Sequence, residues 1–172
     1  MKYITILFLL FSFSAMAIKQ GDTASDFTLK TLSGEKVQLS KLNKNKKVVV
    51  VFIRGWVGYQ CGLCTRQVND FVSKKKQFKD QEVVFIYPGP AKALKKHAKE
   101  FSGQNLWPKN FHFVLDPKSK VVDAYDLRWK MPNETAYPTT LILGKKRKVI
   151  FAKVSKTHGG RAKAVTVLKA LK

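Results

Sequence analysis

The chain contains two cysteines, Cys61 and Cys64, and both lie in one short turn between two strongly patterned segments. Residues 47–53 read Lys-Val-Val-Val-Val-Phe-Ile, a continuous β-branched and apolar run that is typical of a strand buried on both faces of a sheet. Residues 61–79 carry apolar side chains at helical spacing, with lysines on most of the opposite face, which predicts an amphipathic helix. The sequence therefore places a Cys-x-x-Cys motif where a central strand turns into a helix.

The position of the two cysteines at the start of a helix favours thiol chemistry. Unpaired backbone N–H groups and the positive end of the helix dipole stabilise a thiolate relative to a thiol, which makes a cysteine nucleophilic near neutral pH. With Cys61 at the cap and Cys64 one turn further on, the two sulfurs can also join in a disulfide. Because a loop of two intervening residues constrains the unfolded chain very little, the spacing favours a reversible redox dithiol over a structural bridge.

The other segments predict an α/β fold with a central mixed sheet, flanked by helices and preceded by a β-hairpin. Short alternating runs at 26–31 and 36–39 indicate the hairpin, and Ser40 is expected to cap a short helical turn. Because two strands joined through a helix tend to pair in parallel, residues 82–87 are expected beside 47–53. The remaining segments are a helix at 91–101, a strand at 111–115, a helix at 119–125, strands at 136–143 and 149–154 that form a hairpin at the sheet edge, and a final helix at 161–171.

The first 17 residues have the three parts of a signal peptide. Lys2 is followed by an apolar run at 3–13 and then by Ala-Met-Ala, which ends at Ala17. The run is short for a membrane span, so cleavage after Ala17 is expected, which gives a mature domain of residues 18–172. An uncleaved anchor is the alternative. The leader looks bacterial and predicts an exported protein in the periplasm, an oxidising compartment.

The chain has 33 lysines and arginines against 11 acidic residues, a formal net charge of +22. Such an imbalance favours weak binding to anionic surfaces such as phospholipid headgroups or acidic polysaccharide. The lysines are spread along the whole sequence, however, and no recognisable nucleic-acid-binding motif occurs, so specific nucleic-acid recognition is not expected. The mix of apolar and charged residues is that of one globular domain.

Three further segments resemble the AhpC/TSA peroxiredoxin-like proteins of the thioredoxin-fold superfamily. They are Gly-Asp-Thr-Ala-Ser-Asp-Phe-Thr-Leu at 21–29, Leu-Ser-Gly-Glu-Lys-Val at 32–37 and Val-Val-Asp-Ala-Tyr-Asp-Leu at 121–127. TlpA-type thiol-disulfide reductases share the same layout. The resemblance covers nearly the whole mature chain and implies a thioredoxin-like fold. It also implies an exported antioxidant oxidoreductase that reduces hydroperoxides through the Cys-x-x-Cys dithiol, with reduction of protein disulfides as the alternative. Such an enzyme needs no cofactor and is recycled by a thiol electron donor of unknown identity.

The resemblance leaves open which cysteine attacks the substrate. Peroxiredoxins carry Pro-x-x-x-Thr/Ser-x-x-Cys, which puts Val57 on the proline, Cys61 on the Thr/Ser and Cys64 on the peroxidatic cysteine. Two of these three positions depart from the pattern, and a second cysteine replaces the Thr/Ser as in some peroxiredoxin-like proteins. This alignment implies attack on hydroperoxides by Cys64 with Cys61 resolving, whereas the thioredoxin pattern implies attack on protein disulfides by Cys61.

Five other residues are candidates for supporting roles near the cysteines. Peroxiredoxins place an arginine just before the late strand, where this chain has Tyr-Pro, so Arg54 or Arg128 would have to substitute. Arg54 would either lower the pKa of the attacking cysteine by its charge or pair with a surface carboxylate. Pro138 resembles the proline that thioredoxins hold in cis against the cysteine pair. Trp56 and Tyr59 flank the turn and form either an apolar rim of the site or part of the core.

The alternatives to an enzyme are a copper chaperone and a cationic binding module whose disulfide is only a clasp. Copper chaperones of this fold use two cysteines and a distant histidine, a position that His158 would fill, but their cysteine spacing is longer. With His97, His112 and His158 scattered, zinc has no second ligand pair, so no metal site is expected. The loop at 157–161 precedes a helix and would also suit an anion.

Overall fold

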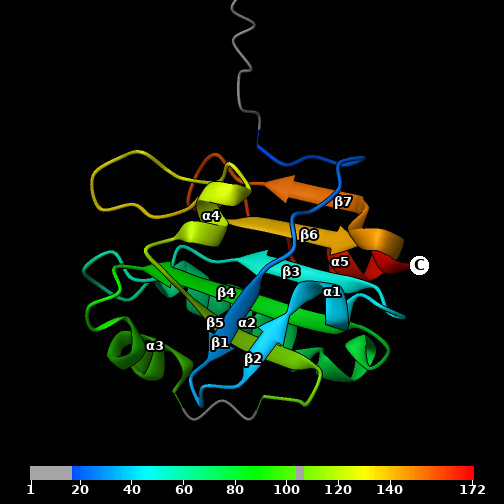
Figure 1. Cartoon of the computed structure of the whole chain (residues 1–172), viewed down its shortest axis with the longest axis horizontal. Coiled ribbons are helices and arrows are strands. Elements are labelled where there is room, and N and C mark those ends of the chain that lie inside the picture. Colours follow the sequence, from blue (N-terminus) through cyan, green and yellow to red (C-terminus); the bar gives the residue numbers. More distant parts are fainter. Residues whose placement is uncertain (1–16, 104–106) are drawn as a thin grey trace, which may run out of the picture.

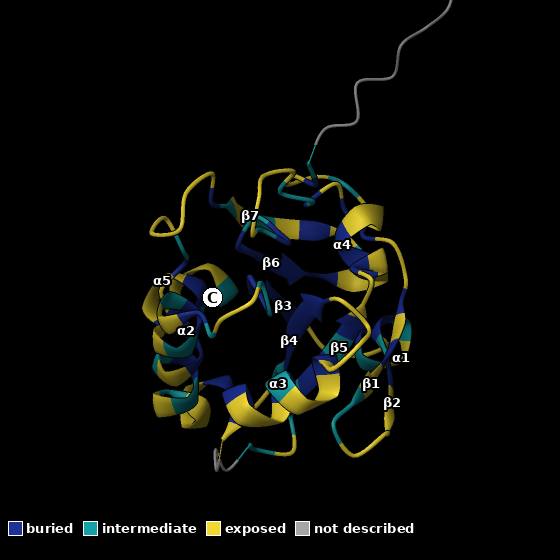
Figure 2. Cartoon of the chain, turned by 90° about the vertical axis from the view of Figure 1, so that its left-hand side faces the viewer, coloured by how far each residue is buried: buried dark blue, intermediate teal, exposed yellow. Residues whose placement is uncertain are grey.

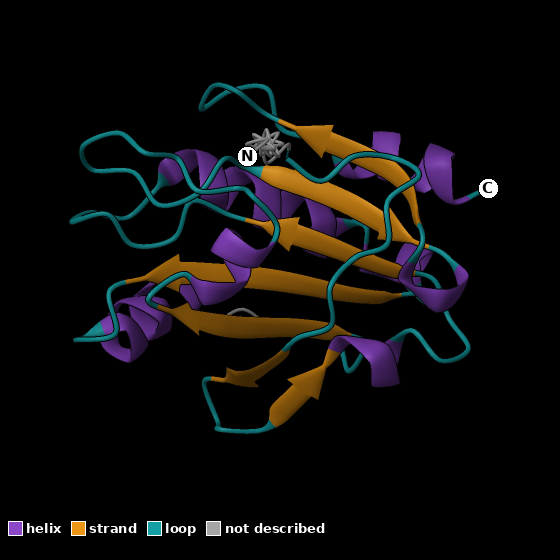
Figure 3. Ribbon diagram, turned by 45° about the horizontal axis from the view of Figure 1, so that its top comes forward, coloured by secondary structure: helices purple, strands orange, loops and turns teal. Residues whose placement is uncertain are grey.

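The computed structural model describes residues 17–103 and 107–172, in which seven strands form a single mixed sheet (Figure 1). The strands are β1 (Thr28–Thr31), β2 (Lys36–Gln38), β3 (Val48–Phe52), β4 (Glu82–Gly89), β5 (Phe111–Pro117), β6 (Thr139–Leu143) and β7 (Val149–Val154). Their order is β2-β1-β5-β4-β3-β6-β7, so the hairpin of β1 and β2 forms one edge and that of β6 and β7 the other (Figure 3). The predicted α/β fold with a mixed sheet and an N-terminal hairpin is confirmed.

β3 lies in the interior of the sheet because its residues are apolar on both sides. It pairs in parallel with β4 and antiparallel with β6. Val48, Val50 and Phe52 enter the hydrophobic core on one face, and Val49 and Val51 enter the core on the other. All five are fully buried. A strand enclosed in this way is a rigid support for the turn that follows it.

Helices cover both faces of the sheet (Figure 2). α2 (Gly62–Ser73), α3 (Leu94–Ser102) and α5 (Ala164–Leu171) contribute to one core, and α1 (Leu39–Leu42) and α4 (Lys120–Ala124) contribute to the core on the opposite face. α2 follows β3 through a short loop and buries its apolar stripe against the sheet. The first turn of α2 is therefore fixed near the carboxyl end of β3.

The helix expected at 61–79 is shorter than predicted. The α-helix ends at Ser73, and a 3₁₀ turn at Lys75–Phe78 follows it. The rings of Phe71 and Phe78 stack with their centroids 5.4 Å apart, whereas seven residues of straight α-helix would separate them by about 10 Å along the axis. The helical path is broken at Lys74, where φ is −105° and ψ is +16°, and both rings enter the same core.

Two other local predictions are wrong at the ends of elements. β4 extends two residues beyond the predicted end at 87, because Pro88 and Gly89 also pair with β5. Ser40 does not cap α1, which begins at Leu39. The backbone N–H and the hydroxyl of Ser40 both donate to the carboxylate of Asp26, at 2.8 and 2.7 Å, so the acceptor comes from the preceding hairpin.

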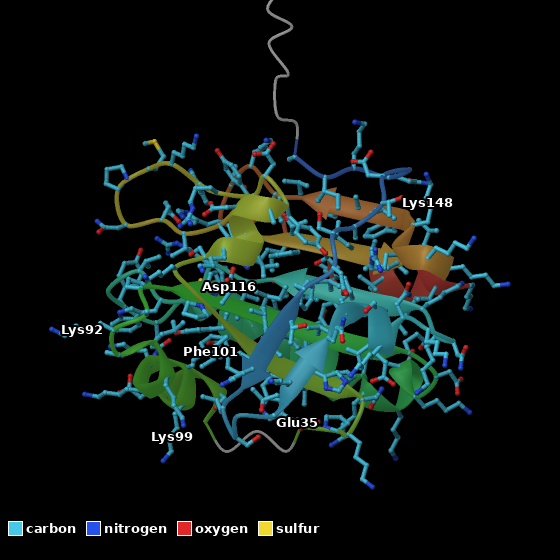
Figure 4. All side chains as sticks on the ribbon, in the orientation of Figure 1. Glu35, Lys92, Lys99, Phe101, Asp116 and Lys148 are labelled. Carbon is cyan, nitrogen blue, oxygen red and sulfur yellow. The ribbon has the colours of Figure 1, made fainter. Side chains whose placement is uncertain are left out.

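The predicted leader at 1–17 lies outside the described residues apart from Ala17, which packs with Ile18 on the core. Within the described ranges, no helix has the length and apolar character needed to cross a bilayer. Lysines extend into solvent from several elements, as Lys92, Lys99 and Lys148 do in Figure 4. The positive charge is therefore distributed over the domain.

Candidate active site

The two cysteines lie at the amino-terminal end of α2. Cys61 is the N-cap residue, in an extended backbone conformation, and its sulfur accepts a hydrogen bond from the backbone N–H of Cys64 at 3.3 Å. Both residues are free thiols. Both are buried, but Cys61 keeps 5% of its surface exposed and Cys64 keeps none, so Cys61 is the less enclosed of the two.

Gly55 lets the loop between β3 and Cys61 approach the end of β4. Its φ is +70°, and a Cβ atom at this position would overlap with the carbonyl group of Pro88. The N–H of Trp56 donates to the same carbonyl oxygen at 3.0 Å. Glycine is therefore required for the close approach that fixes the loop in front of the cysteines.

The surroundings of the two thiols separate their acidities. The hydrogen bond from the Cys64 thiol lowers the pKa of Cys61 well below its ordinary value; burial opposes the shift, and the Cys64 backbone N–H and the charges of Arg161 and Arg54 reinforce it. Burial raises the pKa of Cys64, and its hydrogen bond to Cys61 acts in the same direction. The surroundings therefore favour ionisation of Cys61 over ionisation of Cys64.

Arg161 is a residue of the site that the sequence did not identify. α5 begins at Ala164 and not at the predicted position 161, and the carboxylate of Asp70 accepts the N–H of Ala164 at 2.7 Å. Arg161 consequently stays in the preceding loop. Its Nη2 atom lies 3.4 Å from the sulfur of Cys64 and 3.7 Å from that of Cys61. One guanidinium thus contacts both sulfurs.

Arg54 lies beside the site in a buried ion pair. Its Nε and Nη2 atoms donate to the carboxylate of Glu134 at 2.5 and 2.8 Å, and Nη2 also donates to the Tyr59 hydroxyl at 2.7 Å. The side chains of Arg54 and Glu134 are only 6% and 8% exposed. Burial alone would lower the pKa of Arg54, but the hydrogen bonds to Glu134 and Tyr59 raise it above its ordinary value. The alternative that Arg54 pairs with a carboxylate on the surface is therefore wrong, because its partner Glu134 is buried.

Glu134 also connects the loop of Arg54 with the loop that carries Arg161. Its Oε1 atom lies 2.8 Å from Nε2 of His158. Nε of Arg161 donates to the carbonyl oxygen of His158 at 2.9 Å, and the His158 ring packs on Trp129 with centroids 4.8 Å apart. A single buried carboxylate therefore holds two loops in place next to the cysteines.

Arg128 does not take the place of the peroxiredoxin arginine. Its Nε and Nη2 atoms donate to the carboxylate of Asp123, each at 2.7 Å, and Nη2 also donates to the carbonyl oxygens of Lys118 and Ser119. These partners lie in α4 or just before it, so the guanidinium is turned toward α4. Within the described residues, Arg128 makes no hydrogen bond to either cysteine. The prediction that it could replace the peroxiredoxin arginine is therefore wrong.

Pro138 precedes β6, and its peptide bond is trans. No cis peptide bond occurs among the residues that the structure describes. The expected cis bond is therefore wrong. A trans proline suits the entry to a strand equally well, because its φ is compatible with extended backbone and its missing N–H lies outside the ladder. Pro138 is buried, and its carbonyl oxygen accepts the N–H of Ser155 at 2.9 Å.

Trp56 and Tyr59 have different surroundings. The Trp56 ring stacks on His97 of α3, with centroids 3.5 Å apart and planes 4° from parallel. Tyr59 is 53% exposed, and its ring centroid lies 5.0 Å from the guanidinium carbon of Arg54. Trp56 therefore anchors the cysteine loop to α3, and Tyr59 stands at the rim.

The histidines do not form a metal site with the cysteines. His97, His112 and His158 each contact a glutamate, at 2.8 or 2.9 Å. Over residues 17–103 and 107–172, no three His, Cys, Asp or Glu side chains gather into a set that could hold a metal ion. His158 approaches the site through Glu134.

Comparison with known proteins identifies relatives of this chain. Residues 20–152 match the AhpC/TSA family. The thioredoxin-like protein YneN of Bacillus subtilis is 30% identical over 141 residues, which cover 81% of this chain and 74% of YneN. The thiol-disulfide oxidoreductase ResA of the same species is 30% identical over 137 residues, which cover 78% of this chain and 66% of ResA. The description of ResA agrees with an oxidoreductase that acts through thiols.

A solved structure shows the same fold. The peroxidoxin BcpB from Mycobacterium tuberculosis superposes on this chain with a TM-score of 0.70 at 23% sequence identity. The superposition covers 90% of this chain and 96% of BcpB. The α/β architecture described above is therefore a thioredoxin-like fold, as the resemblance implies.

Proposed function

The chain belongs to the AhpC/TSA family of oxidoreductases, and from that membership we propose that it reduces protein disulfides through the Cys61 and Cys64 dithiol. Cys61 is the attacking thiolate and Cys64 the resolving thiol. The asymmetry of the pair carries this assignment: Cys61 caps α2, has a lowered pKa and keeps solvent exposure, whereas Cys64 is fully buried. The order of attack is the reverse of the one that the peroxiredoxin pattern implies.

The reaction transfers two electrons from the dithiol to the substrate. The Cys61 thiolate attacks one sulfur of the substrate disulfide, forms a mixed disulfide and releases the other sulfur as a thiolate. Cys64 then passes its proton to the released substrate thiolate, attacks the sulfur of Cys61, closes the Cys61–Cys64 disulfide and releases the second substrate sulfur as a thiolate. The substrate gains two electrons and the protein loses two, so a separate thiol donor must reduce the protein before the next cycle.

Hydroperoxide reduction by the same dithiol is the second candidate, and the position of Arg161 favours it. A guanidinium in contact with both sulfurs can also donate to a peroxide oxygen that approaches the thiolate. The thiolate would attack one oxygen, the O–O bond would break with release of an alcohol or water, and the other cysteine would convert the resulting sulfenic acid into a disulfide with loss of water. In this reaction too, exposure favours Cys61 as the attacking residue.

The two candidates are separated by the rates at which the fully reduced protein loses its free thiols. Insulin, as a protein disulfide, and hydrogen peroxide are supplied at equal concentration in separate experiments. We expect oxidation by the protein disulfide to be at least about tenfold faster. The less enclosed sulfur is that of Cys61, and the chain has Val57 at the position of the peroxiredoxin proline and Tyr137 and Pro138 where that pattern has its arginine. A faster reaction with peroxide would make peroxide reduction the function, and no reaction with either would leave only the non-enzymatic binding module.

We further propose that residues 1–17 direct export and are removed after Ala17. The three-part pattern of the leader supports this proposal. The full chain expressed in a bacterium is expected to reach the periplasm and to begin at Ile18 on N-terminal sequencing. A protein that keeps its leader and stays attached to the membrane would instead support the uncleaved anchor.

A further inference from the structure

We propose that Arg161 serves the two sulfurs in turn: it first stabilises the attacking thiolate of Cys61 and then the thiolate of Cys64 that resolves the mixed disulfide. Its Nη2 atom lies within 3.7 Å of the Cys61 sulfur and is closer still, at 3.4 Å, to the Cys64 sulfur. The inference rests on the proposed dithiol function and deepens it. It makes Arg161 a catalytic residue for both steps.

The guanidinium is held in place before any substrate arrives. Its Nη1 atom donates to Oε1 of Gln67 at 3.1 Å, and its Nε atom donates to the carbonyl oxygen of His158 at 2.9 Å. Gln67 is itself buried, and its Nε2 atom donates to Thr140 at 3.4 Å and to the carbonyl oxygen of Ala162 at 3.3 Å. Two nitrogens of the guanidinium are thus occupied by fixed acceptors, which directs the third at the sulfurs.

The other charged and titratable groups around the sulfurs cannot take the same role. The Arg54 guanidinium adds positive charge from the end of β3, but it is paired with Glu134. Tyr87 of β4 is neutral, because burial raises its pKa well above the ordinary value. In the part of the chain that the structure describes, Arg161 is the cation that hydrogen-bonds the sulfurs.

The charge on the pair moves during the reaction, and Arg161 is placed to follow it. In the reduced protein the negative charge of Cys61 and the buried position of Cys64 keep Cys64 protonated. When Cys61 bonds to the substrate sulfur, its charge leaves with the departing substrate thiolate, and the guanidinium loses its anion. The proton of Cys64 then passes to that released thiolate. The new Cys64 thiolate attacks the Cys61 sulfur, breaks its bond to the substrate and expels the second substrate thiolate.

The ionisation of Cys64 in a Cys61→Ser background tests the second half of this role without any substrate. Serine at 61 removes the competing thiolate, so the ultraviolet absorbance of the one remaining thiolate, followed against pH, reports Cys64 alone. We expect an added Arg161→Met substitution to raise the midpoint by about one pH unit, which lowers the thiolate fraction about tenfold below the midpoint. An added Arg161→Lys substitution should restore most of the shift, because lysine keeps the charge.

Arg128→Met in the same background is the matched control, since Arg128 is an arginine paired with Asp123 away from the cysteines. It should leave the Cys64 midpoint unchanged. In the chain with both cysteines, Arg161→Met should also slow the resolving step about tenfold, so that a mixed disulfide with insulin accumulates. An unchanged midpoint in the Arg161→Met protein, or an equal shift in the Arg128→Met protein, overturns the inference. Because the titration uses no substrate, its result tests the role of Arg161 even if protein disulfides are not the substrate.

Discussion

Replacing Cys61 with serine is expected to abolish disulfide reduction, whereas replacing Cys64 with serine should give a protein that attacks once and then stops. Cys61 supplies the thiolate at the helix N-terminus, and Cys64, which is fully buried, acts only on the sulfur beside it. Loss of the nucleophile should lower turnover by on the order of a thousandfold or more, as it does in other enzymes with a single attacking group. The Cys64→Ser protein should instead accumulate a covalent adduct with the substrate.

Insulin reduction at equal protein concentration gives the rates, and mass spectrometry of the intact protein detects the adduct. Wild-type protein that has been fully oxidised before the assay is the control for background exchange. A Cys61→Ser protein that forms a stable adduct while the Cys64→Ser protein forms none would show that the roles are reversed. That result would restore the order of attack of the peroxiredoxin pattern.

The lowered pKa of Cys61 in the wild-type protein sets the pH range in which the site works. Because the pKa of Cys61 is lowered, the thiolate is already formed at neutral pH and should persist as the pH falls below 7. Alkylation of Cys61 by iodoacetamide should therefore change little between pH 8 and about pH 6.5, whereas an ordinary thiol loses about tenfold in reactivity per pH unit below its pKa. The urea-unfolded protein provides that ordinary profile, and a coincidence of the two profiles would contradict the assignment of Cys61.

Local sequence pattern predicts the elements that position the cysteines because the physical cause is local. The apolar run at 47–53 becomes β3 since both of its faces must be buried, and the strand at 149–154 is found with the predicted bounds. Errors occur where tertiary contacts decide the ends of elements. The stacking of Phe71 on Phe78 is associated with the early end of α2, and Asp70 binds the first turn of α5 at Ala164.

The supporting residues of the site were harder to predict for the same reason. Arg161 lies 97 positions after Cys64, and Glu134 lies 80 positions after Arg54. No spacing rule connects residues so far apart. The loops that carry Glu134 and Arg161 are rich in polar residues with nearby glycine, proline or asparagine, a composition that predicts a loop but no partner for either side chain. The resemblance offered only Arg128 or Arg54 for this role. The guanidinium of Arg128 instead binds Asp123, five residues earlier. From a single sequence one cannot tell whether an arginine will bind a nearby carboxylate or a thiol that is distant along the chain.

The side chain of Glu134 contributes both to the stability of the domain and to the geometry of the site. It pairs with Arg54 from the end of β3 and with His158 from the loop of Arg161. Removing the carboxylate with Glu134→Ala leaves the Arg54 guanidinium buried without a counter-ion. Breaking a buried ion pair in this way destabilises proteins by about 3–5 kcal/mol, because the remaining charge stays desolvated. In a domain of this size the melting temperature should fall by roughly 10 °C.

The Arg128–Asp123 pair is a matched control for this prediction, because it is also an arginine bound by a carboxylate but its side chains are 31% and 52% exposed. Asp123→Ala should cost at most about 1 kcal/mol, as expected for an exposed pair. Urea unfolding of the reduced proteins measures both changes. Combining Glu134→Leu with Arg54→Met removes both charges and should recover much of the loss, since an apolar pair of similar volume carries no desolvation penalty. If Glu134→Ala destabilises no more than Asp123→Ala, the two loops are held by packing, and the ion pair is not what fixes Arg161 beside the sulfurs.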